Sequence, residues 1–400
     1  MDNHLLPIIH FTEEVMHRGE GSYLYDTDGK KYLDLNSGQF CVALGHSNKE
    51  ILDEIFAKAG KVVHTASNIY TDEVAECSNL LNKMSGDMDA YSILLSTGSE
   101  AVEFCLRYAK FIKGRQGVVC FDKGYHGLTL GSQSITFGGK FTKPHVNDIA
   151  SVSVPETAEE AAESIKALKE LLKSGEYAAV VTEPIVSVGG MIYPPKEWFK
   201  QLREVCDEYD TLIVFDESQT GFGRTGDWFA YQTYDTVPDM VVLAKSVGLG
   251  FPVSAALFRK ELLPEGDVYA MSHYSSHQND SFAAAIINTA VRYMEENNVL
   301  EGIKERGDYF LSKLKELEAK NSHILKARGK GLMLGCELDY EGVTDYRPLY
   351  AKLYDRMMKN GVIIQGTNGG HTLRFLPDYL ITHEDIDFAI DTLDRVLNEL

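Results

Sequence analysis

The sequence lacks a long apolar run. No apolar stretch in its 400 residues approaches the roughly 18 residues that a membrane-spanning helix requires. The opening residues, MDNHLLPIIHF, contain neither a basic region nor a small-residue cleavage site, so they do not resemble a signal peptide. These absences predict a cytoplasmic protein that makes no use of a membrane.

Basic residues are also scarce. The chain has 39 Lys and Arg against 59 Asp and Glu, which gives a formal net charge of -20. An acidic protein of this kind is not expected to bind nucleic acid or an anionic membrane surface. The balance says little about a single pocket, because a phosphate site can be locally positive inside an acidic protein.

Cysteine is sparse as well, and its six copies are scattered along the chain. No two form a CxxC pair, and no Cys/His cluster has the spacing of a zinc site. Most lie in apolar stretches, which predicts buried, reduced thiols. The chain also lacks a GxGxxG after an early strand, and this absence disfavours a Rossmann dehydrogenase.

Short apolar runs alternate with amphipathic stretches through the middle of the chain, which predicts an α/β fold with a mostly parallel sheet. The expected strands are 93–96, 118–121, 178–182, 212–215, 241–244 and 254–258, with helices at 99–113 and 156–172. The ends differ: residues 20–35 predict a hairpin around an Asp-Gly turn, and long polar helices follow residue 290. We therefore expect a large domain of residues 46–290 and a small α+β domain built from residues 1–45 and 291–400.

An acid and an amine close two of the predicted strands. Asp216 ends Leu-Ile-Val-Phe-Asp, and Lys245 ends Met-Val-Val-Leu-Ala-Lys. The carboxyl ends of parallel strands form the ligand crevice of an α/β sheet. Pyridoxal 5'-phosphate needs an amine for its aldehyde and a carboxylate against its ring nitrogen. Taken singly, Asp216 could cap a turn and Lys245 could extend from an edge strand to solvent.

Small and aromatic residues follow two further strands. Thr97-Gly98-Ser99 lies between a predicted strand and a predicted helix, where exposed backbone N–H groups can bind a phosphate. Ser99 could equally be a plain helix cap. Tyr125 follows the strand 118–121 and could stack on a flat ring, although a half-buried core tyrosine is an equally simple interpretation.

Two other polar residues fit a coenzyme and a substrate. Gln219 lies near Asp216 and could donate to the phenolic oxygen of the coenzyme ring. Arg374 lies in an apolar run, where its planar fork would suit a substrate carboxylate. An internal salt bridge is the alternative for Arg374.

Together these residues resemble the class III aminotransferases, which are pyridoxal-phosphate enzymes of fold type I. The likeness runs from Tyr23 to Arg374 and is most specific in Asp216–Gly226 joined to Lys245. It implies a large domain with a mostly parallel, seven-stranded-type sheet, a small domain from both termini, and a homodimer with shared active sites. A hydroxyl of the neighbouring subunit would reach the phosphate, with Ser276 the best match and Ser275 the second.

The resemblance also assigns roles within the site. Lys245 and Asp216 would be catalytic, with Lys245 bonded to the coenzyme and Asp216 at its ring nitrogen. The remaining coenzyme-binding residues implied by the resemblance are Thr97, Gly98, Ser99, Tyr125, Glu183, Gln219 and Ser276.

Within the family, the chain most resembles dialkylglycine decarboxylase. Gln39 in Asn-Ser-Gly-Gln-Phe and the segment 275–280 carry much of that likeness. It implies a K⁺ or Na⁺ site with Asp280 and Ser67 as ligands, because oxygen ligands suit hard cations. A turn-capping Asp280 is the alternative. The chain departs from that pattern at three pocket positions, Tyr125, Val188 and Ser281.

The substrate is suggested by two replacements. Leu128 stands where ornithine- and acetylornithine-type aminotransferases carry an arginine, and Val188 stands where they carry a glutamate. The chain is therefore predicted to move an amino group from an amino acid or amine to an oxo acid such as pyruvate. Gln39, Leu128 and Arg374 would bind the substrate, and decarboxylation would accompany transfer if Gln39 holds a carboxylate out of the ring plane. The alternatives are a racemase or aminomutase, and an ornithine- or acetylornithine-type transaminase that uses 2-oxoglutarate.

Overall fold

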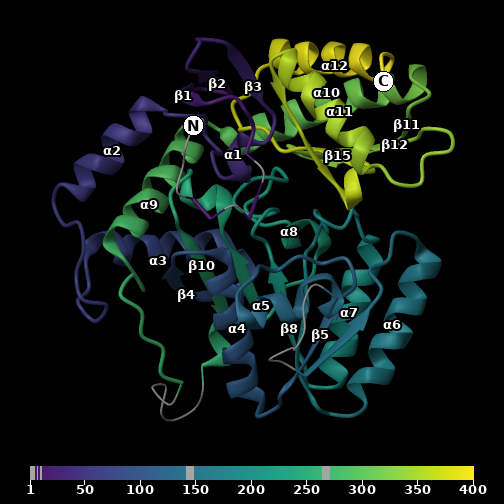
Figure 1. Ribbon diagram of the computed structural model, residues 1–400. Coiled ribbons are helices and arrows are strands. Elements are labelled where there is room, and N and C mark those ends of the chain that lie inside the picture. The colour runs from purple at the N-terminus through teal and green to yellow at the C-terminus, as the bar shows by residue number, and fades with distance from the viewer. Residues whose placement is uncertain (1–4, 7, 10, 141–147, 264–270) are drawn as a thin grey trace.

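The computed structural model describes residues 5–6, 8–9, 11–140, 148–263 and 271–400, and its strands form three sheets (Figure 1). The strands are β1 (Met16–Glu20), β2 (Tyr23–Asp26), β3 (Lys31–Asp34), β4 (Ala90–Leu95), β5 (Gly117–Phe121), β6 (Asp148–Val152), β7 (Tyr177–Thr182), β8 (Leu212–Asp216), β9 (Met240–Leu243), β10 (Ser254–Arg259), β11 (Ile324–Lys330), β12 (Met333–Leu338), β13 (Val362–Ile363), β14 (Gln365–Thr367) and β15 (Thr372–Phe375). The helices used below are α2 (Lys49–Ala59), α3 (Asp72–Ser85), α4 (Gly98–Lys113), α6 (Ala158–Leu172), α7 (Lys196–Glu208), α9 (Ser281–Glu296), α10 (Val299–Lys320), α11 (Arg347–Lys359) and α12 (His383–Leu397).

The central sheet has seven strands in the order β4-β10-β9-β8-β7-β5-β6. Strands β5 to β9 run parallel with their neighbours, whereas β10 is antiparallel to both β4 and β9. Both faces are buried, as parallel sheets require. Along β8, Ile213 and Phe215 enter the core beneath α3, α6 and α7, while Val214 enters the core beneath α4. The predicted α/β fold class is confirmed.

The predicted strands and helices of the centre coincide with β4, α4, β5, α6, β7, β8, β9 and β10 to within a few residues. The sequence reading did not include β6, α3 or α7. The β6 strand, Asp-Ile-Ala-Ser-Val, has two polar residues and exposed positions at the sheet edge, so it lacks the apolar run that identified its neighbours.

The two ends of the chain lie together above the central sheet in Figure 1. The β2–β3 hairpin is present, and β13 from the C-terminal part runs parallel to β3 at its other edge. Strands β11, β12, β15 and β14 form an antiparallel sheet, against which α10 packs. The predicted division at residues 45 and 290 stays a prediction.

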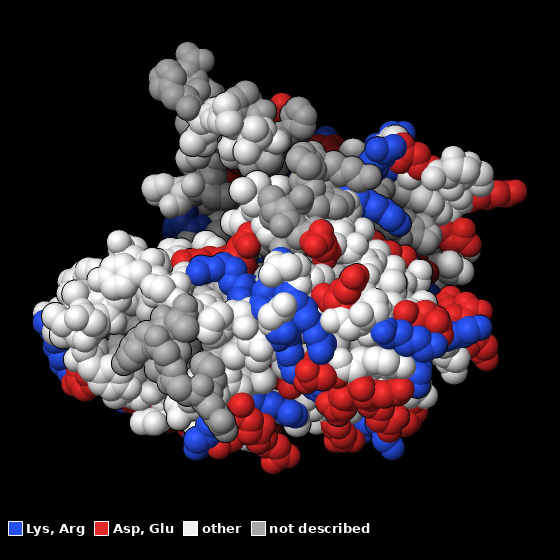
Figure 2. Space-filling view, turned by 90° about the horizontal axis from the view of Figure 1, so that it is seen from below, with Lys and Arg blue, Asp and Glu red and all other residues white. Residues whose placement is uncertain are grey.

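The surface seen in Figure 2 carries acidic and basic side chains side by side, with acidic groups gathered toward one edge. None of the described helices is long and apolar enough to cross a bilayer. All six cysteines are free thiols; Cys41 is partly buried and the other five are buried. The predicted cytoplasmic location stays a prediction.

Candidate active site

A cavity of about 260 Å³ lies at the carboxyl ends of β8 and β9. It brings together predicted coenzyme residues from distant parts of the chain, namely Thr97, Gly98, Ser99, Tyr125, Glu183, Asp216, Gln219 and Lys245. The sequence reading assigned no role to several other lining residues, namely Cys41, Ser96, Gly127, Ser218, Ala244, Phe251, Pro252 and Val253. The convergence matches the rule that ligands bind where parallel strands end.

Asp216 is the last residue of β8, and it is buried. Its Oδ2 lies 2.9 Å from Nδ1 of His126, and its Oδ1 accepts a hydrogen bond from the Ser218 N–H at 3.1 Å. Burial acts to raise the pKa of Asp216, but the hydrogen bond and charge of His126, helped by Lys245, outweigh it and hold the pKa below its usual value. The carboxylate is therefore ionised at neutral pH.

His126, the partner of Asp216, was not singled out from the sequence. It is buried, and its Nε2 is a buried atom without a hydrogen-bond partner. The 90 positions between His126 and Asp216 explain the omission, since nothing local links the two. His126 also lines the cavity, and its hydrogen bond fixes the orientation of the Asp216 carboxylate, as an outer partner does for a ligand.

Lys245 lies just beyond β9, at the start of the 3₁₀ turn Lys245–Gly248. Its backbone φ of 52° is in the left-handed region, which is strained for a lysine and is commonly found at functional sites. The amine makes no hydrogen bond to any residue that the structure describes. Burial lowers the pKa of Lys245, and the nearby charges of Asp216 and Glu183 only partly oppose this shift. A lowered pKa favours the neutral amine, which is the nucleophilic form.

The N-terminus of α4 opens onto the same cavity. Thr97 is the helix cap, and its Oγ1 accepts a hydrogen bond from the Glu100 N–H at 3.2 Å, so the alternative that Ser99 is the cap is wrong. The N–H groups of Gly98 and Ser99 occupy the first turn and have no acceptor within the helix. A Cβ at Gly98 would come within 3.0 Å of the Ala244 Cβ, so glycine is the residue that fits best at this position. These features are those of a helix-terminal phosphate site.

Glu183 connects the loop after β7 to the loop that carries Tyr125. Its Oε1 accepts a hydrogen bond from the Tyr125 N–H at 2.9 Å, and its Oε2 accepts one from the Ser187 N–H at 3.3 Å. The Tyr125 ring is partly buried and its centroid lies 6.0 Å from that of Phe137. Burial raises the pKa of Glu183 to about 7.

The raised pKa of Glu183 predicts a pH-dependent stability. The folded protein binds this proton more tightly than the unfolded chain does, so the free energy of unfolding falls as pH rises from about 4.5 to about 7. The free energy of unfolding of the coenzyme-free protein can be measured with urea at pH 5 and at pH 8. Its decrease between these two pH values should be about 2 kcal/mol smaller for Glu183→Gln than for the parent. Glu301→Gln, on an exposed face of α10, should leave the parent's loss unchanged. Equal losses for Glu183→Gln and the parent would contradict the assignment.

Arg374 lies on β15 and is buried. It does not line the cavity itself, but Ser187 connects it to Gln219, which does. Its Nη1 donates to the Ser187 Oγ at 3.1 Å and its Nη2 donates to the Gln365 Oε1 at 2.7 Å. Burial lowers the pKa of Arg374 to about 10, so the guanidinium is still charged at neutral pH. Arg374 has no ion pair within the described part of the chain, so the alternative of an internal salt bridge is not found there. The charge is held by neutral groups.

A short hydrogen-bond chain joins Arg374 to the coenzyme residues. The Ser187 Oγ that accepts from Arg374 donates in turn to the Gln219 Oε1 at 2.9 Å. Gln219 lines the cavity, so its amide group is oriented through its oxygen while its NH₂ remains for a ligand. Neither Ser187 nor Gln365 was singled out from the sequence.

The remaining predicted site residues lie outside this cavity. Gln39, Leu128 and Ser276 are exposed and are not among the cavity's lining residues. Asp280 caps α9, and its Oδ1 accepts a hydrogen bond from the Phe282 N–H at 2.8 Å. The Ser67 Oγ donates to the Ser275 carbonyl at 2.9 Å. The predicted roles of these residues, including the alkali-cation site, stay predictions.

The residues of the cavity fit pyridoxal 5'-phosphate. An amine without a hydrogen-bond partner in the described chain lies in the same cavity as an ionised, buried carboxylate, as the two ends of the ring require. Gly127 has a φ of 110°, and a Cβ there would come within 2.1 Å of the Ser99 Oγ, so this loop is also built for close backbone approach to the phosphate-binding turn.

Comparisons with known proteins agree. The sequence matches the family described as "Aminotransferase class-III" over residues 10–397. It is 32% identical to the acetylornithine aminotransferase of Methanosarcina mazei, over 95% of this chain and 91% of that protein. It is 32% identical to the [LysW]-aminoadipate semialdehyde/glutamate semialdehyde transaminase of Sulfolobus acidocaldarius, over 94% and 92% of the two chains. A thermostable (S)-enantioselective omega-transaminase from Thermomicrobium roseum superposes with a TM-score of 0.91 at 25% identity, covering 99% of this chain and 96% of that one.

The fold and the cavity define a pyridoxal-phosphate enzyme of fold type I. The chain belongs to the class III aminotransferase family, and it is a pyridoxal-phosphate-dependent aminotransferase that acts on small amino and oxo compounds.

Proposed function

We propose that this aminotransferase takes an amino group from an amino acid or amine and gives it to a small oxo acid with a single carboxylate, such as pyruvate. The observation that carries this proposal is the setting of Arg374, whose fork is held by the neutral Ser187 and Gln365. A substrate carboxylate can replace these weak partners with a charge-assisted bidentate pair. Leu128 offers no charge to a second carboxylate.

The residues divide the chemistry among them. Bound pyridoxal phosphate supplies an aldehyde that holds the amino group and a ring that accepts electrons from the substrate carbon. Asp216, which is ionised and fixed by His126, would hold a proton on the ring nitrogen of the bound coenzyme. Lys245 holds the coenzyme at rest, and its Nζ then moves the proton of the substrate Cα. Gly98 and Ser99 hold the phosphate with their N–H groups.

The identity of the oxo acid distinguishes the two aminotransferase hypotheses, one with pyruvate as the amino acceptor and the other with 2-oxoglutarate. The two curated relatives bear the names of acetylornithine and aminoadipate or glutamate semialdehyde transaminases, and they favour the 2-oxoglutarate alternative for this chain. Leu128 and the neutral partners of Arg374 favour pyruvate instead. The enzyme whose coenzyme already carries the amino group can be mixed with pyruvate or with 2-oxoglutarate. The kcat/KM for pyruvate should be at least about tenfold higher than that for 2-oxoglutarate, the effect of one weak polar contact. Equal or faster reaction with 2-oxoglutarate would establish the alternative, and turnover of an amino acid with no oxo acid present would indicate a racemase.

Replacing Arg374 should test the carboxylate site directly. Arg374→Gln should lower kcat/KM for pyruvate by about 10- to 100-fold, because a hydrogen bond to a charged group contributes about 1.5–3 kcal/mol. The reaction with butanal, which has no carboxylate, serves as the matched control and should change little. A similar loss with both acceptors would mean that Arg374 supports the fold of the site and does not bind the carboxylate.

As a more specific form of this proposal, the enzyme couples transamination to decarboxylation, as its likeness to dialkylglycine decarboxylase suggests. It depends on Gln39, which is exposed in the single chain and would have to reach the substrate in the assembled enzyme. If it does, Gln39 would bind a second carboxylate of the substrate, and the coenzyme would supply the chemistry by which that carboxylate is lost as CO₂. Incubation with 2-aminoisobutyrate and pyruvate tests this branch, since absence of both CO₂ and acetone would leave a simple transaminase.

A homodimer with shared active sites is the assembly we propose. Ser276 is exposed and does not line the cavity of its own chain, which suits a hydroxyl that acts on the partner's phosphate site. Nearby segments expose large apolar side chains, including Val63, Tyr70 and Tyr274, of which Tyr274 is 75% exposed. An interface would cover such a surface. A monomer in sedimentation of the coenzyme-loaded protein would contradict this assembly.

A further inference from the structure

Two histidines and one aspartate converge beside the coenzyme cavity. His64 lies in the segment between α2 and α3, whereas His277 and Asp280 lie at the start of α9. Their potential ligand atoms all lie within 4.8 Å of one another. The 213-residue separation of the two histidines explains why no sequence spacing indicated a metal site: His64 and Asp280 are 216 positions apart, and His277 is only 3 from Asp280.

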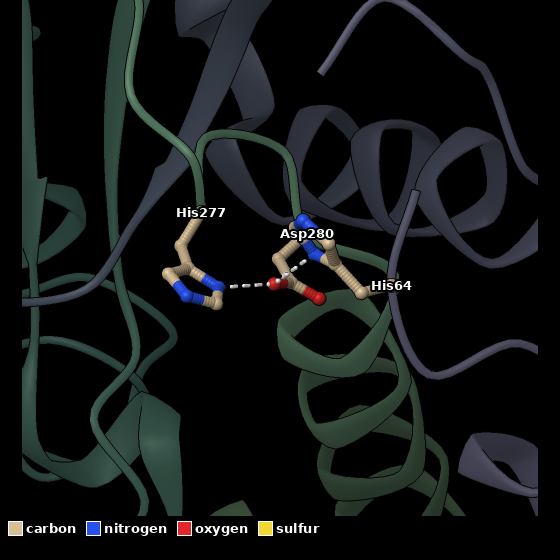
Figure 3. A group of neighbouring side chains, drawn as sticks. All are labelled: His64, His277 and Asp280. Atoms are coloured by element: carbon tan, nitrogen blue, oxygen red, sulfur yellow. Dashed lines mark hydrogen bonds and ion pairs between the residues drawn. The ribbon is translucent and has the colours of Figure 1, made fainter. Parts of the chain in front are cut away.

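Both imidazoles face the same carboxylate oxygen of Asp280. The Asp280 Oδ2 lies 3.0 Å from the His64 Nδ1 and 2.6 Å from the His277 Nδ1, so both imidazoles present the same ring nitrogen to one oxygen (Figure 3). The other carboxylate oxygen is fixed by the Phe282 N–H at the start of α9. An oxygen oriented in this way is what an outer hydrogen bond gives a metal-ligating carboxylate.

We propose that His64, His277 and Asp280 bind a divalent transition ion of the zinc type. Imidazole nitrogen with carboxylate oxygen is a ligand set that suits Zn²⁺ and its neighbours, whereas an alkali cation takes oxygen ligands. Three protein ligands leave a fourth position open to water or another ligand. The two imidazoles therefore distinguish this site from the all-oxygen K⁺ or Na⁺ site predicted at Asp280.

The proposed ion site has an apolar cavity on one side. His64 and His277 are exposed in the single chain. They are adjacent in sequence to Val63 and Ser276, so in the proposed homodimer the ion would be bound near the subunit interface. Behind them lies a cavity of about 250 Å³ whose wall includes Leu95, Phe282 and Ile286. This cavity shares Ser96, Phe251, Pro252 and Val253 with the coenzyme cavity, so a bound ion would lie next to the active site.

The simplest competing interpretation is a hydrogen-bonded trio without an ion. Each imidazole could donate its Nδ1 proton to Asp280, and such contacts need no metal. The two interpretations differ in what a single loss does. If the three side chains only form hydrogen bonds, the parent binds ions weakly and nonspecifically, and a substitution does not change that binding. If they bind an ion, removing one of the three ligands abolishes specific binding.

Ion binding should be measured on the coenzyme-loaded enzyme after dialysis against a chelator. We expect one Zn²⁺ per chain by calorimetry, and visible absorption bands of bound Co²⁺ as an independent readout. His277→Gln and Asp280→Asn should each weaken Zn²⁺ binding by more than about 100-fold, beyond the 10- to 100-fold that loss of an outer partner costs. Asn is as good a helix cap as Asp, so Asp280→Asn should keep α9 intact.

His383→Gln is the matched control. His383 also pairs with a carboxylate, that of Glu305 at 2.7 Å, but among the described residues no third metal-ligating side chain lies beside this pair. This variant should bind Zn²⁺ like the parent. No saturable binding by the parent, or equal binding by the parent and His277→Gln, would overturn the proposal. Displacement of Co²⁺ by a modest excess of K⁺ would also overturn it, in favour of an alkali site.

Discussion

Lys245→Ala is expected to lose at least about 10⁴-fold in transamination rate, the upper end of what one positioned proton-transfer group contributes. The reason is that one amine performs two tasks: it bonds the coenzyme and it moves the proton of the substrate carbon. Its lowered pKa and its lack of a hydrogen-bond partner in the described chain prepare it for both. Single-turnover rates with a saturating amino donor measure the loss.

Borohydride reduction locates the coenzyme bond in the same experiment. The parent protein should carry the reduced coenzyme on the peptide that contains Lys245, and Lys245→Ala should carry none. Lys58→Met is the matched control, because Lys58 is a buried lysine that bonds to Thr289 at 3.1 Å, outside the cavity. It should keep the label and most of the activity. A label on any other lysine of the parent would remove the basis of the assigned site.

The second large effect is expected for Asp216→Asn, which keeps the shape of the side chain and removes its charge. Without the carboxylate of Asp216, the protonated ring nitrogen of the coenzyme would lose its charged partner, and the ring would be a poorer acceptor of electrons. Loss of one preorganised electrostatic contact costs about 10²–10³ in rate, and we expect a loss of at least this size in kcat. The coenzyme should still bond to Lys245.

Glu217→Gln supplies the comparison for Asp216. Glu217 is the next residue and is equally buried, but its oxygens accept hydrogen bonds from the Ala230 N–H and the Tyr231 N–H, away from the cavity. Its substitution should leave kcat within a few-fold of the parent, after correction for folded protein by circular dichroism. If Asp216→Asn retained kcat within about tenfold of the parent, the carboxylate would have no part in the chemistry.

The catalytic pair was predictable from the sequence because its evidence is local. Asp216 and Lys245 each follow an unbroken apolar run, and such a run predicts a buried strand whatever the rest of the chain does. The strand's end then places the polar residue at the ligand edge. The phosphate turn at Gly98 was predictable for the same reason, since strand, small residues and helix follow one another directly.

The partners of these residues were not predictable in this way. His126 meets Asp216 across 90 positions, and Ser187 meets Arg374 across 187. Gln365 lies only 9 positions from Arg374, yet the two meet because β14 and β15 pair with these residues in register. Register depends on tertiary packing and is not encoded in a short window. The direction of β10 could not be predicted for a related reason, because apolar periodicity does not distinguish a parallel from an antiparallel neighbour.

The reversal of β10 has a consequence for how the enzyme works. Leu243 of β9 pairs with Ala255 of β10, so the chain that carries Lys245 leaves the sheet and returns to it at the adjacent position, without a crossover helix. The segment that carries Lys245 is thereby anchored at both ends by the hydrogen bonds between β9 and β10, two strands of the buried central sheet. The backbone at Lys245 is therefore held in place during catalysis. Only the Lys245 side chain, the substrates and the products need to move.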